Sequence, residues 1–120
     1  DPSILAETGV EEFIRWVSPV LNMRRTATED HELHGQQIKA GDEILLMYPS
    51  ANRDERAFDD PDTFDVHRGH NHHVSFGFGT HFCLGASLAR LEIRVMFEEL
   101  LRRIPDWQQR KLRRIFGDRP

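Results

Sequence analysis

A glycine-rich segment of ten residues, 76–85 (FGFGTHFCLG), constrains this 120-residue chain more than any other feature. It contains the only cysteine, Cys83, and runs directly into a long segment with apolar periodicity, so the sulfur is expected beside a helix N-terminus. Backbone N–H groups and the helix dipole favour a thiolate at such a place. The glycines permit tight turns and a close approach of the backbone to a flat ligand. A cysteine in this setting is suited to bind iron, whereas the alternative for a lone cysteine is a small buried hydrophobe.

Length and composition bound the class of protein. The 120 residues suffice for one domain with a modest core. A single cysteine excludes an internal disulfide and fits a reducing, cytoplasmic location. No apolar run approaches membrane-spanning length, and no secretory signal is visible. The chain begins with Asp1 and not with methionine, so it is expected to start inside a longer reading frame or to have been processed.

The net charge of −4 is unevenly distributed along the chain. Residues 90–120 contain nine Lys and Arg against five Asp and Glu, a balance of +4. This basic end could meet an acidic partner, and an ordinary solvated helix face explains it equally well. Basic and aromatic residues are not interleaved in the way that would indicate nucleic-acid binding.

The first half of the chain predicts one helix followed by β structure. Thr8 and Glu11 have the spacing of a capping box, which predicts a helix that starts near Gly9 and ends before Pro19. Residues 23–27 are expected to be extended, residues 32–38 to form a hairpin that turns near Gly35, and residues 43–48 to form a strand after a turn at 40–42. A short helical piece is expected over 50–55, and residues 57–74 are expected to be irregular.

The second half predicts one long helix over residues 85–104, stopped by Pro105. It has two apolar stripes at spacings of four, three and four residues. One contains Leu84, Leu88, Leu91 and Val95, and the other contains Ile93, Phe97, Leu100 and Ile104. Two stripes imply burial over much of the helix circumference, in a core larger than these 120 residues provide.

Six positions of the segment 76–85 match the fixed residues of the haem-ligand loop of the cytochrome P450 family, Phe-Gly-x-Gly-x-His/Arg-x-Cys-x-Gly. They are Phe76, Gly77, Gly79, His81, Cys83 and Gly85. Over essentially its whole length the chain resembles the C-terminal haem-binding part of a soluble bacterial member. The resemblance implies a mainly α fold with a small β-sheet, haem b (iron protoporphyrin IX) as cofactor, and Cys83 as the axial ligand of the haem iron.

The same resemblance divides the chain into family segments. They are a Glu-x-x-Arg helix (1–18), a β-rich stretch (19–56), a meander (57–75), the haem-ligand loop (76–85), a long helix (86–104) and a tail (105–120). Glu12, Arg15 and Arg68 take the places of a buried ionic triad whose role is structural. An i,i+3 pair such as Glu12 and Arg15 is by itself more often a surface ion pair.

Further site residues follow from the resemblance. Arg25 and His81 take the positions that bind the two haem propionates, with Arg24 as the alternative to Arg25. Phe76 would shield the sulfur from water, and Gly85 and Ala89 would let the long helix approach the ring. Val20, Leu21, Asn22 and Met23 take the place of a substrate-contacting stretch, for which ordinary core is the alternative. The cluster of His67, His70, His72 and His73 fits no usual zinc framework and is interpreted as loop structure, with adventitious metal binding as the alternative.

The implied function is that of a haem-dependent monooxygenase, which inserts one oxygen atom of O2 into a C–H bond of a small apolar substrate. The sequence of residues 48–68 and 82–90 resembles the branch of the family that oxidises sterols and other lipids. The implied partner is a ferredoxin-type redox protein with its reductase. No catalytic residue for proton delivery is identified, so these 120 residues alone are expected to be inactive. The alternatives are a non-catalytic haem-thiolate sensor and a truncated product without function.

Overall fold

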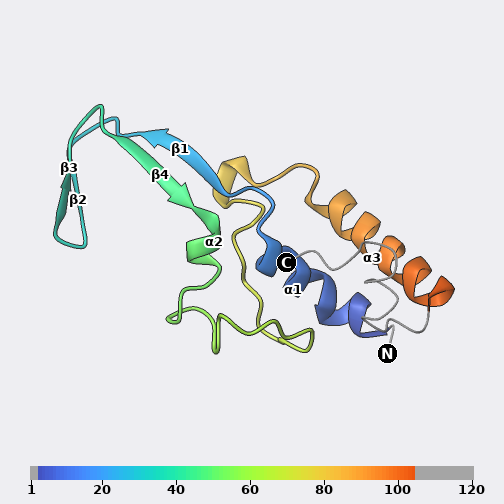
Figure 1. The fold of residues 1–120 in the computed structure, drawn as a ribbon. Coiled ribbons are helices and arrows are strands. Elements are labelled where there is room, and N and C mark those ends of the chain that lie inside the picture. The colour runs from blue at the N-terminus through green and yellow to red at the C-terminus, as the bar shows by residue number, and fades with distance from the viewer. Residues whose placement is uncertain (1–2, 105–120) are drawn as a thin grey trace, which may run out of the picture.

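A computed structural model describes residues 3–104, which form helices, small sheets and a long irregular segment (Figure 1). A π-helical turn, Leu5–Gly9, precedes helix α1 (Val10–Val17). Strands β1 (Asn22–Thr26), β2 (His31–Leu33), β3 (Gln36–Ile38) and β4 (Glu43–Met47) follow, and then the short helix α2 (Tyr48–Ala51). A 3-10 turn (Gly79–His81) leads to α3 (Ala86–Arg103). This combination of helices and small sheets confirms the predicted fold class.

The N-terminal helix begins earlier than the sequence predicts. Residues 3–9 are already helical, so Thr8 does not lie at a helix start and makes no capping bond. Its hydroxyl donates instead to the carbonyl oxygen of Val66 in the irregular segment. The predicted capping box is therefore wrong. The predicted end before Pro19 is confirmed, because α1 stops at Val17 and Ser18 takes a left-handed conformation with φ 43°.

The strands form an arm that extends away from the helices (Figure 1). Strands β1 and β4 pair antiparallel, with Arg25 opposite Ile44, and the hairpin β2–β3 lies at the far end of the arm. His34 and Gly35 connect β2 to β3 with φ of 48° and 79°, which is the geometry of a type I′ turn. This confirms the predicted hairpin. Side chains alternate along β1, so Arg24 and Arg25 point to opposite faces of the arm.

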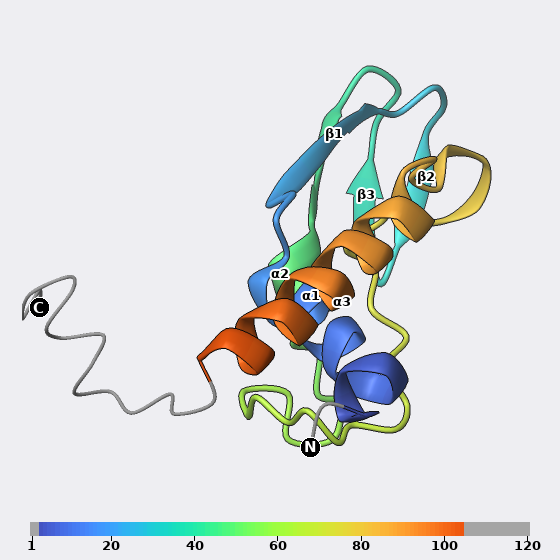
Figure 2. The same ribbon diagram turned by 90° about the vertical axis from the view of Figure 1, so that its right-hand side faces the viewer.

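Helix α3 packs along α1 (Figure 2). Only one of the two apolar stripes of α3 is partly covered. The Phe97 ring stacks on the Phe13 ring of α1 with 4.3 Å between centroids. The partly covered residues of this stripe are Ile93, Phe97 and Leu100, and Ile104 is exposed. The other stripe, Leu84, Leu88, Leu91 and Val95, is exposed. Burial of both stripes therefore does not occur within residues 3–104, since α1 covers one side of α3.

The segment that connects α2 to the 3-10 turn has no regular secondary structure. Helix α2 starts at Tyr48, two residues before the predicted start, because Pro49 is well tolerated in a first helical turn. The following residues 57–75 wrap beneath α1 as turns and extended chain, as the sequence predicts. Within residues 3–104, no helix combines the length and the apolar character needed to cross a membrane.

Candidate functional site

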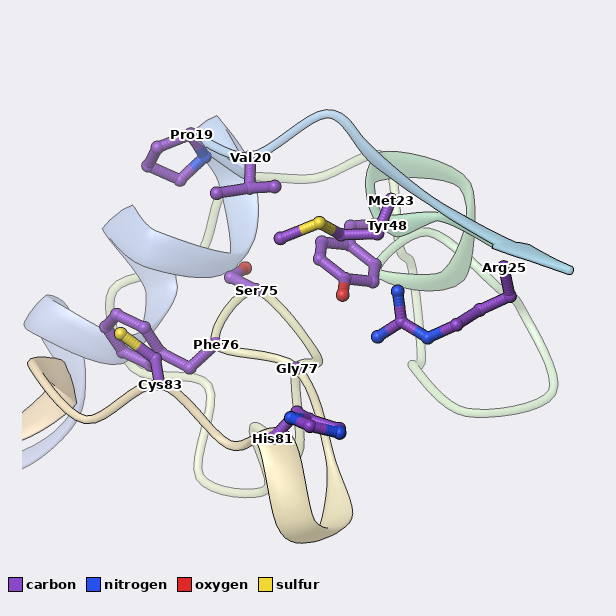
Figure 3. A pocket seen from close by; sticks show the side chains of 10 residues that line it. All are labelled: Pro19, Val20, Met23, Arg25, Tyr48, Ser75, Phe76, Gly77, His81 and Cys83. Carbon is purple, nitrogen blue, oxygen red and sulfur yellow. The ribbon is translucent and has the colours of Figure 1, made fainter. Parts of the chain in front are cut away.

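A cavity of about 560 Å³ lies where the end of α1, strand β1, helix α2 and the glycine-rich segment meet (Figure 3). Its lining residues are Pro19, Val20, Met23, Arg25, Tyr48, Ser75, Phe76, Gly77, His81 and Cys83. The lining is mainly apolar, with a few polar groups that converge on it, which is typical of a small-molecule site.

Cys83 lies at one end of this cavity, between the 3-10 turn and the start of α3 (Figure 3). Its thiol is free and exposed, and its N–H donates to the Phe76 carbonyl oxygen at 2.9 Å. The loop reaches this shape through Gly77 and Gly79, which have φ of 76° and 71°. A side chain at either position would be strained, so these two glycines are explained by the backbone alone.

Polar groups gather at the opposite end of the cavity. Arg25 and His81 both line it and are exposed, and the half-buried ring of Tyr48 lines it as well (Figure 3). Among the described residues, Arg25 donates only to the carbonyl oxygen of its neighbour Arg24, and no hydrogen bond uses the Tyr48 hydroxyl. Arg24 faces away from the cavity and pairs with Glu43 at 2.8 Å. Arg25, rather than Arg24, is therefore the arginine that can contact a ligand here.

The cavity contains some of the site residues that the sequence suggests and not others. Those that line it are Val20, Met23, Arg25, Phe76, Gly77, His81 and Cys83. Those that do not are Leu21, Asn22, Gly79, Gly85 and Ala89. Leu21 and Asn22 are exposed next to the lining residue Val20. Sequence reasoning missed Pro19, Tyr48 and Ser75, since no local pattern marks a residue that only the fold brings to a cavity.

A buried ionic network lies beside the cavity, centred on the carboxylate of Glu12. Both Glu12 and Arg15 are completely buried, and their side chains join through two hydrogen bonds of 2.7 Å. Glu12 also accepts from Arg68 Nε at 3.2 Å, from the Asp65 N–H at 2.8 Å and from Asn71 Nδ2 at 3.0 Å. The structure thus brings Glu12, Arg15 and Arg68 into one network.

The guanidinium of Arg15 is saturated with acceptors. Beyond Glu12, it donates to the carbonyl oxygens of Asn52 and Pro61 at 2.8 Å and of Thr63 at 3.1 Å. With the two bonds to Glu12, this employs all five N–H groups that an arginine has. A buried charge is tolerated only when it is paired and hydrogen-bonded in this way. Arg15 therefore fixes the irregular segment beneath α1.

Asn52 extends this network towards the cavity and was not found from the sequence. Its side-chain NH2 donates to the hydroxyls of Ser18 and Ser75, each at 2.8 Å, and its side-chain oxygen accepts from the Val74 N–H at 2.8 Å. Asn52 and Ser18 are completely buried, and Ser75 also lines the cavity. The buried network thereby supports the wall of the cavity.

The electrostatics of Glu12 agree with this arrangement. Burial on its own would raise the pKa of Glu12, but the hydrogen bonds from Arg15 and the Asp65 N–H and the charges of Arg15 and Arg68 outweigh it. The net effect is a lowered pKa for Glu12. The group stays ionised at neutral pH and serves as a structural anion.

Glu11, the neighbour of Glu12, belongs to a second cluster, which sequence reasoning also missed. Its carboxylate pairs with His73 at 3.1 Å and with Arg90 of α3 at 2.6 Å. The His73 hydrogen bond, together with the hydrogen bonds and charge of Arg90, overcomes partial burial and lowers the pKa of Glu11 to about 2.

The other histidines do not assemble with His73. The rings of His70 and His72 stack with 6.4 Å between centroids, and His67 is exposed. In the part of the chain that the structure describes, no three His, Cys, Asp or Glu side chains are grouped as metal ligands. The stacked rings lie in a loop, as interpreted from the sequence.

Comparison with known proteins identifies the wider group to which these features correspond. The family model described as "Cytochrome P450" matches residues 5–105. A steroid C26-monooxygenase of Mycolicibacterium smegmatis is 59% identical over 98 residues, which are 82% of this chain and 24% of that protein. A methyl-branched lipid omega-hydroxylase of Mycobacterium tuberculosis is 60% identical over 103 residues, 85% of this chain and 24% of that protein. The chain therefore spans about a quarter of the length of these relatives.

Several solved structures also match the fold of this chain. The cytochrome P450 PksS of Bacillus subtilis matches with a TM-score of 0.84 and 50% identity, over 88% of this chain and 27% of that one. CYP109E1 of Bacillus megaterium, solved in complex with testosterone, matches with a TM-score of 0.82 and 44% identity, over 87% of this chain and 29% of that one. The arrangement of the helices, the arm and the glycine-rich loop is thus part of a known fold.

Proposed function

Because the chain belongs to the cytochrome P450 family, whose cofactor is haem b, we propose that the Cys83 cavity is the haem site of a monooxygenase. The observation that carries this proposal is the distribution of groups around the cavity. A free sulfur lies at one end, basic and hydroxyl donors lie at the other, and apolar side chains lie between them. This donor set fits a mainly apolar macrocycle that carries iron at its centre and carboxylates at one edge.

Several of the lining residues have a role in this proposal. Cys83, as a thiolate, would bind the iron, and Phe76 would keep water away from the sulfur. Arg25 and His81 bind the propionates, because a guanidinium and an imidazole N–H are strong donors to carboxylates. The hydroxyl of Tyr48 is a third donor at the same rim. When bound, the haem supplies the chemistry that places one oxygen atom of O2 into a C–H bond.

The proposed substrate is a small apolar molecule of the sterol or branched-lipid class. The named activities of the two mycobacterial relatives support this choice. In this chain, Val20 and Met23 present apolar side chains to the cavity and would contact such a substrate. The electrons would come from a ferredoxin and its reductase in the cytoplasm.

Monooxygenase activity is proposed for the full-length protein and not for residues 1–120 alone. Among the described residues that line the cavity, none is identified as a proton-delivery group, since Arg25, His81 and Tyr48 are assigned to the propionates. The exposed stripe of α3 also leaves apolar surface that promotes aggregation. The 120-residue polypeptide, supplied with haem, ferredoxin, reductase and NAD(P)H, is expected to hydroxylate neither sterols nor lipids.

Spectroscopy and turnover of the full-length protein test the proposal. The reduced CO complex is expected to show the strongly red-shifted Soret band of thiolate ligation, and Cys83→Ala is expected to abolish it. An unchanged band in Cys83→Ala would refute the ligand assignment. Oxygen-dependent hydroxylation of a sterol or branched lipid is also expected. A thiolate spectrum without turnover of either class would favour a haem sensor.

A further inference from the structure

The Phe76 ring, which lines the cavity beside Cys83, contacts a cluster of ionisable side chains that joins three segments distant in the sequence. Glu11 of α1 accepts from Arg90 of α3 through Nε at 2.6 Å and Nη2 at 2.9 Å. The same carboxylate pairs with His73 Nε2 at 3.1 Å, in the segment just before the glycine-rich loop. One carboxylate thus links α1 to α3 and to the segment that precedes the glycine-rich loop.

Both partners of Glu11 lie against Phe76. The Arg90 guanidinium carbon is 4.7 Å from the centroid of the Phe76 ring, within the range of a cation–π contact. The centroid of the His73 ring lies 5.9 Å from that of the Phe76 ring, and the Phe82 ring lies 6.2 Å from it in an edge-on arrangement. The ring therefore has neighbours that restrict its rotation, and Arg90 is the one that carries a permanent positive charge and binds Glu11 through two hydrogen bonds.

Arg90 differs from the other ion-paired arginines of α3. Arg94, one turn further along, reaches Glu98 of the same helix at 3.9 Å, and Arg102 and Arg103 both pair with Glu99 of the same helix. Arg90 instead forms a bidentate ion pair with Glu11 of α1, and its side chain is only 35% exposed. A planar guanidinium can make this fork and stack on a ring at once, which a lysine cannot do.

We propose that Arg90 is a positioning residue for the iron ligand: anchored by Glu11, its guanidinium holds the Phe76 ring where it shields Cys83 from water. This inference rests on the proposed function, since it requires Cys83 to bind iron. Figure 3 shows the Phe76 ring and the Cys83 sulfur at the same end of the cavity. The Cys83 N–H also donates to the Phe76 carbonyl oxygen at 2.9 Å, so a displaced Phe76 would disturb the ligand loop directly.

The iron–sulfur stretching frequency of the full-length ferric haem protein, measured by resonance Raman spectroscopy, tests this role. Water that reaches the sulfur donates hydrogen bonds to it and weakens the iron–sulfur bond. Arg90→Gln is therefore expected to lower the frequency, and Arg90→Lys to restore it only in part. Arg94→Gln is the matched control, because it removes an arginine from the same helix, and it is expected to leave the frequency unchanged.

A double-mutant cycle separates this role from general loosening of the fold. Phe76→Ala should lower the frequency, and adding Arg90→Gln to it should cause no further shift, because Arg90 acts through the ring. Additive shifts, or an unshifted frequency in Arg90→Gln, would overturn the inference. If Arg90→Gln does not fold, Glu11→Gln takes its place in the cycle with the same expected results. An iron–sulfur band that persists in Cys83→Ala would instead refute the proposed function itself.

Discussion

Two arginines, Arg15 in the buried network and Arg25 at the rim of the cavity, show how differently this chain treats its polar groups. Arg15 is completely buried and donates all five of its N–H groups to protein oxygens. Arg25 is exposed, and within residues 3–104 it donates only to a neighbouring carbonyl oxygen. The first arginine completes the fold, whereas the second has donors available for a ligand. Substitutions should therefore affect stability in one region and haem binding in the other.

The largest effect is expected from Arg15→Met in the full-length protein. It leaves the Glu12 carboxylate and three backbone carbonyls without their buried donor, which should cost about 3–5 kcal/mol of unfolding free energy. Urea denaturation measures this loss. The matched control is Arg56→Gln, because Arg56 pairs with Asp54 on the surface, and a loss of similar size in the control would remove the distinction.

Asn52→Ala is expected to have the next largest effect. It leaves the Val74 N–H without its acceptor, which should cost about 1–3 kcal/mol if no replacement is found. The hydroxyls of Ser18 and Ser75 lose the Asn52 donor but keep the bonds that they donate to backbone carbonyl oxygens. Denaturation midpoints measure the change. Asn22→Ala, on exposed strand β1, is the control and should change the midpoint little. Equal midpoints for the two variants would contradict the importance of the buried network.

The sequence predicted the local structure better than the contacts between distant segments. The hairpin, the end of α1 and the long helix followed from turn residues, Pro19 and apolar periodicity, which are local signals. Contacts of Asn52 and of Glu11 join positions more than twenty residues apart through an irregular segment, where no periodicity reports on neighbours. The capping-box prediction failed for a related reason, since a local motif cannot reveal that the preceding residues are already helical.

At the rim, Arg25→Gln should leave the unfolding free energy of the haem-free protein within about 0.5 kcal/mol of wild type. It should weaken haem retention about tenfold, because a charge-assisted hydrogen bond to a carboxylate is lost. Transfer of haem to an acceptor apoprotein measures the retention. Arg24→Gln is the control, since Arg24 faces Glu43 outside the cavity. If Arg24→Gln loses haem as fast as Arg25→Gln, the assignment of the rim is wrong.

Acid should weaken the Glu11 cluster. The pKa of Glu11 is about 2 in the folded protein against an ordinary value of 4.5, so its contribution is complete above pH 4.5 and declines as the pH falls towards 2. The contribution of this partly exposed group is on the order of 1 kcal/mol. Denaturation at about pH 6 and about pH 3 should therefore show a smaller acid-induced loss of stability in Glu11→Gln than in wild type. Equal losses would contradict the lowered pKa.

Tyr48→Phe should have the smallest effect. It removes one neutral donor at the rim and no hydrogen bond within the described residues, so haem retention should fall about fivefold while stability stays unchanged. Haem transfer and thermal unfolding, measured on the same samples, check both statements. A clear loss of stability would show that the hydroxyl serves the fold rather than the ligand.

The most direct test of Cys83 as the ligand at the cavity is the X-ray absorption fine structure of iron in the full-length protein. One sulfur atom is expected in the first coordination shell of iron in wild type and in Arg25→Gln, and this sulfur should be missing in Cys83→Ala. A first shell without sulfur in the wild-type protein, or a sulfur that persists in Cys83→Ala, would show that Cys83 does not bind the iron.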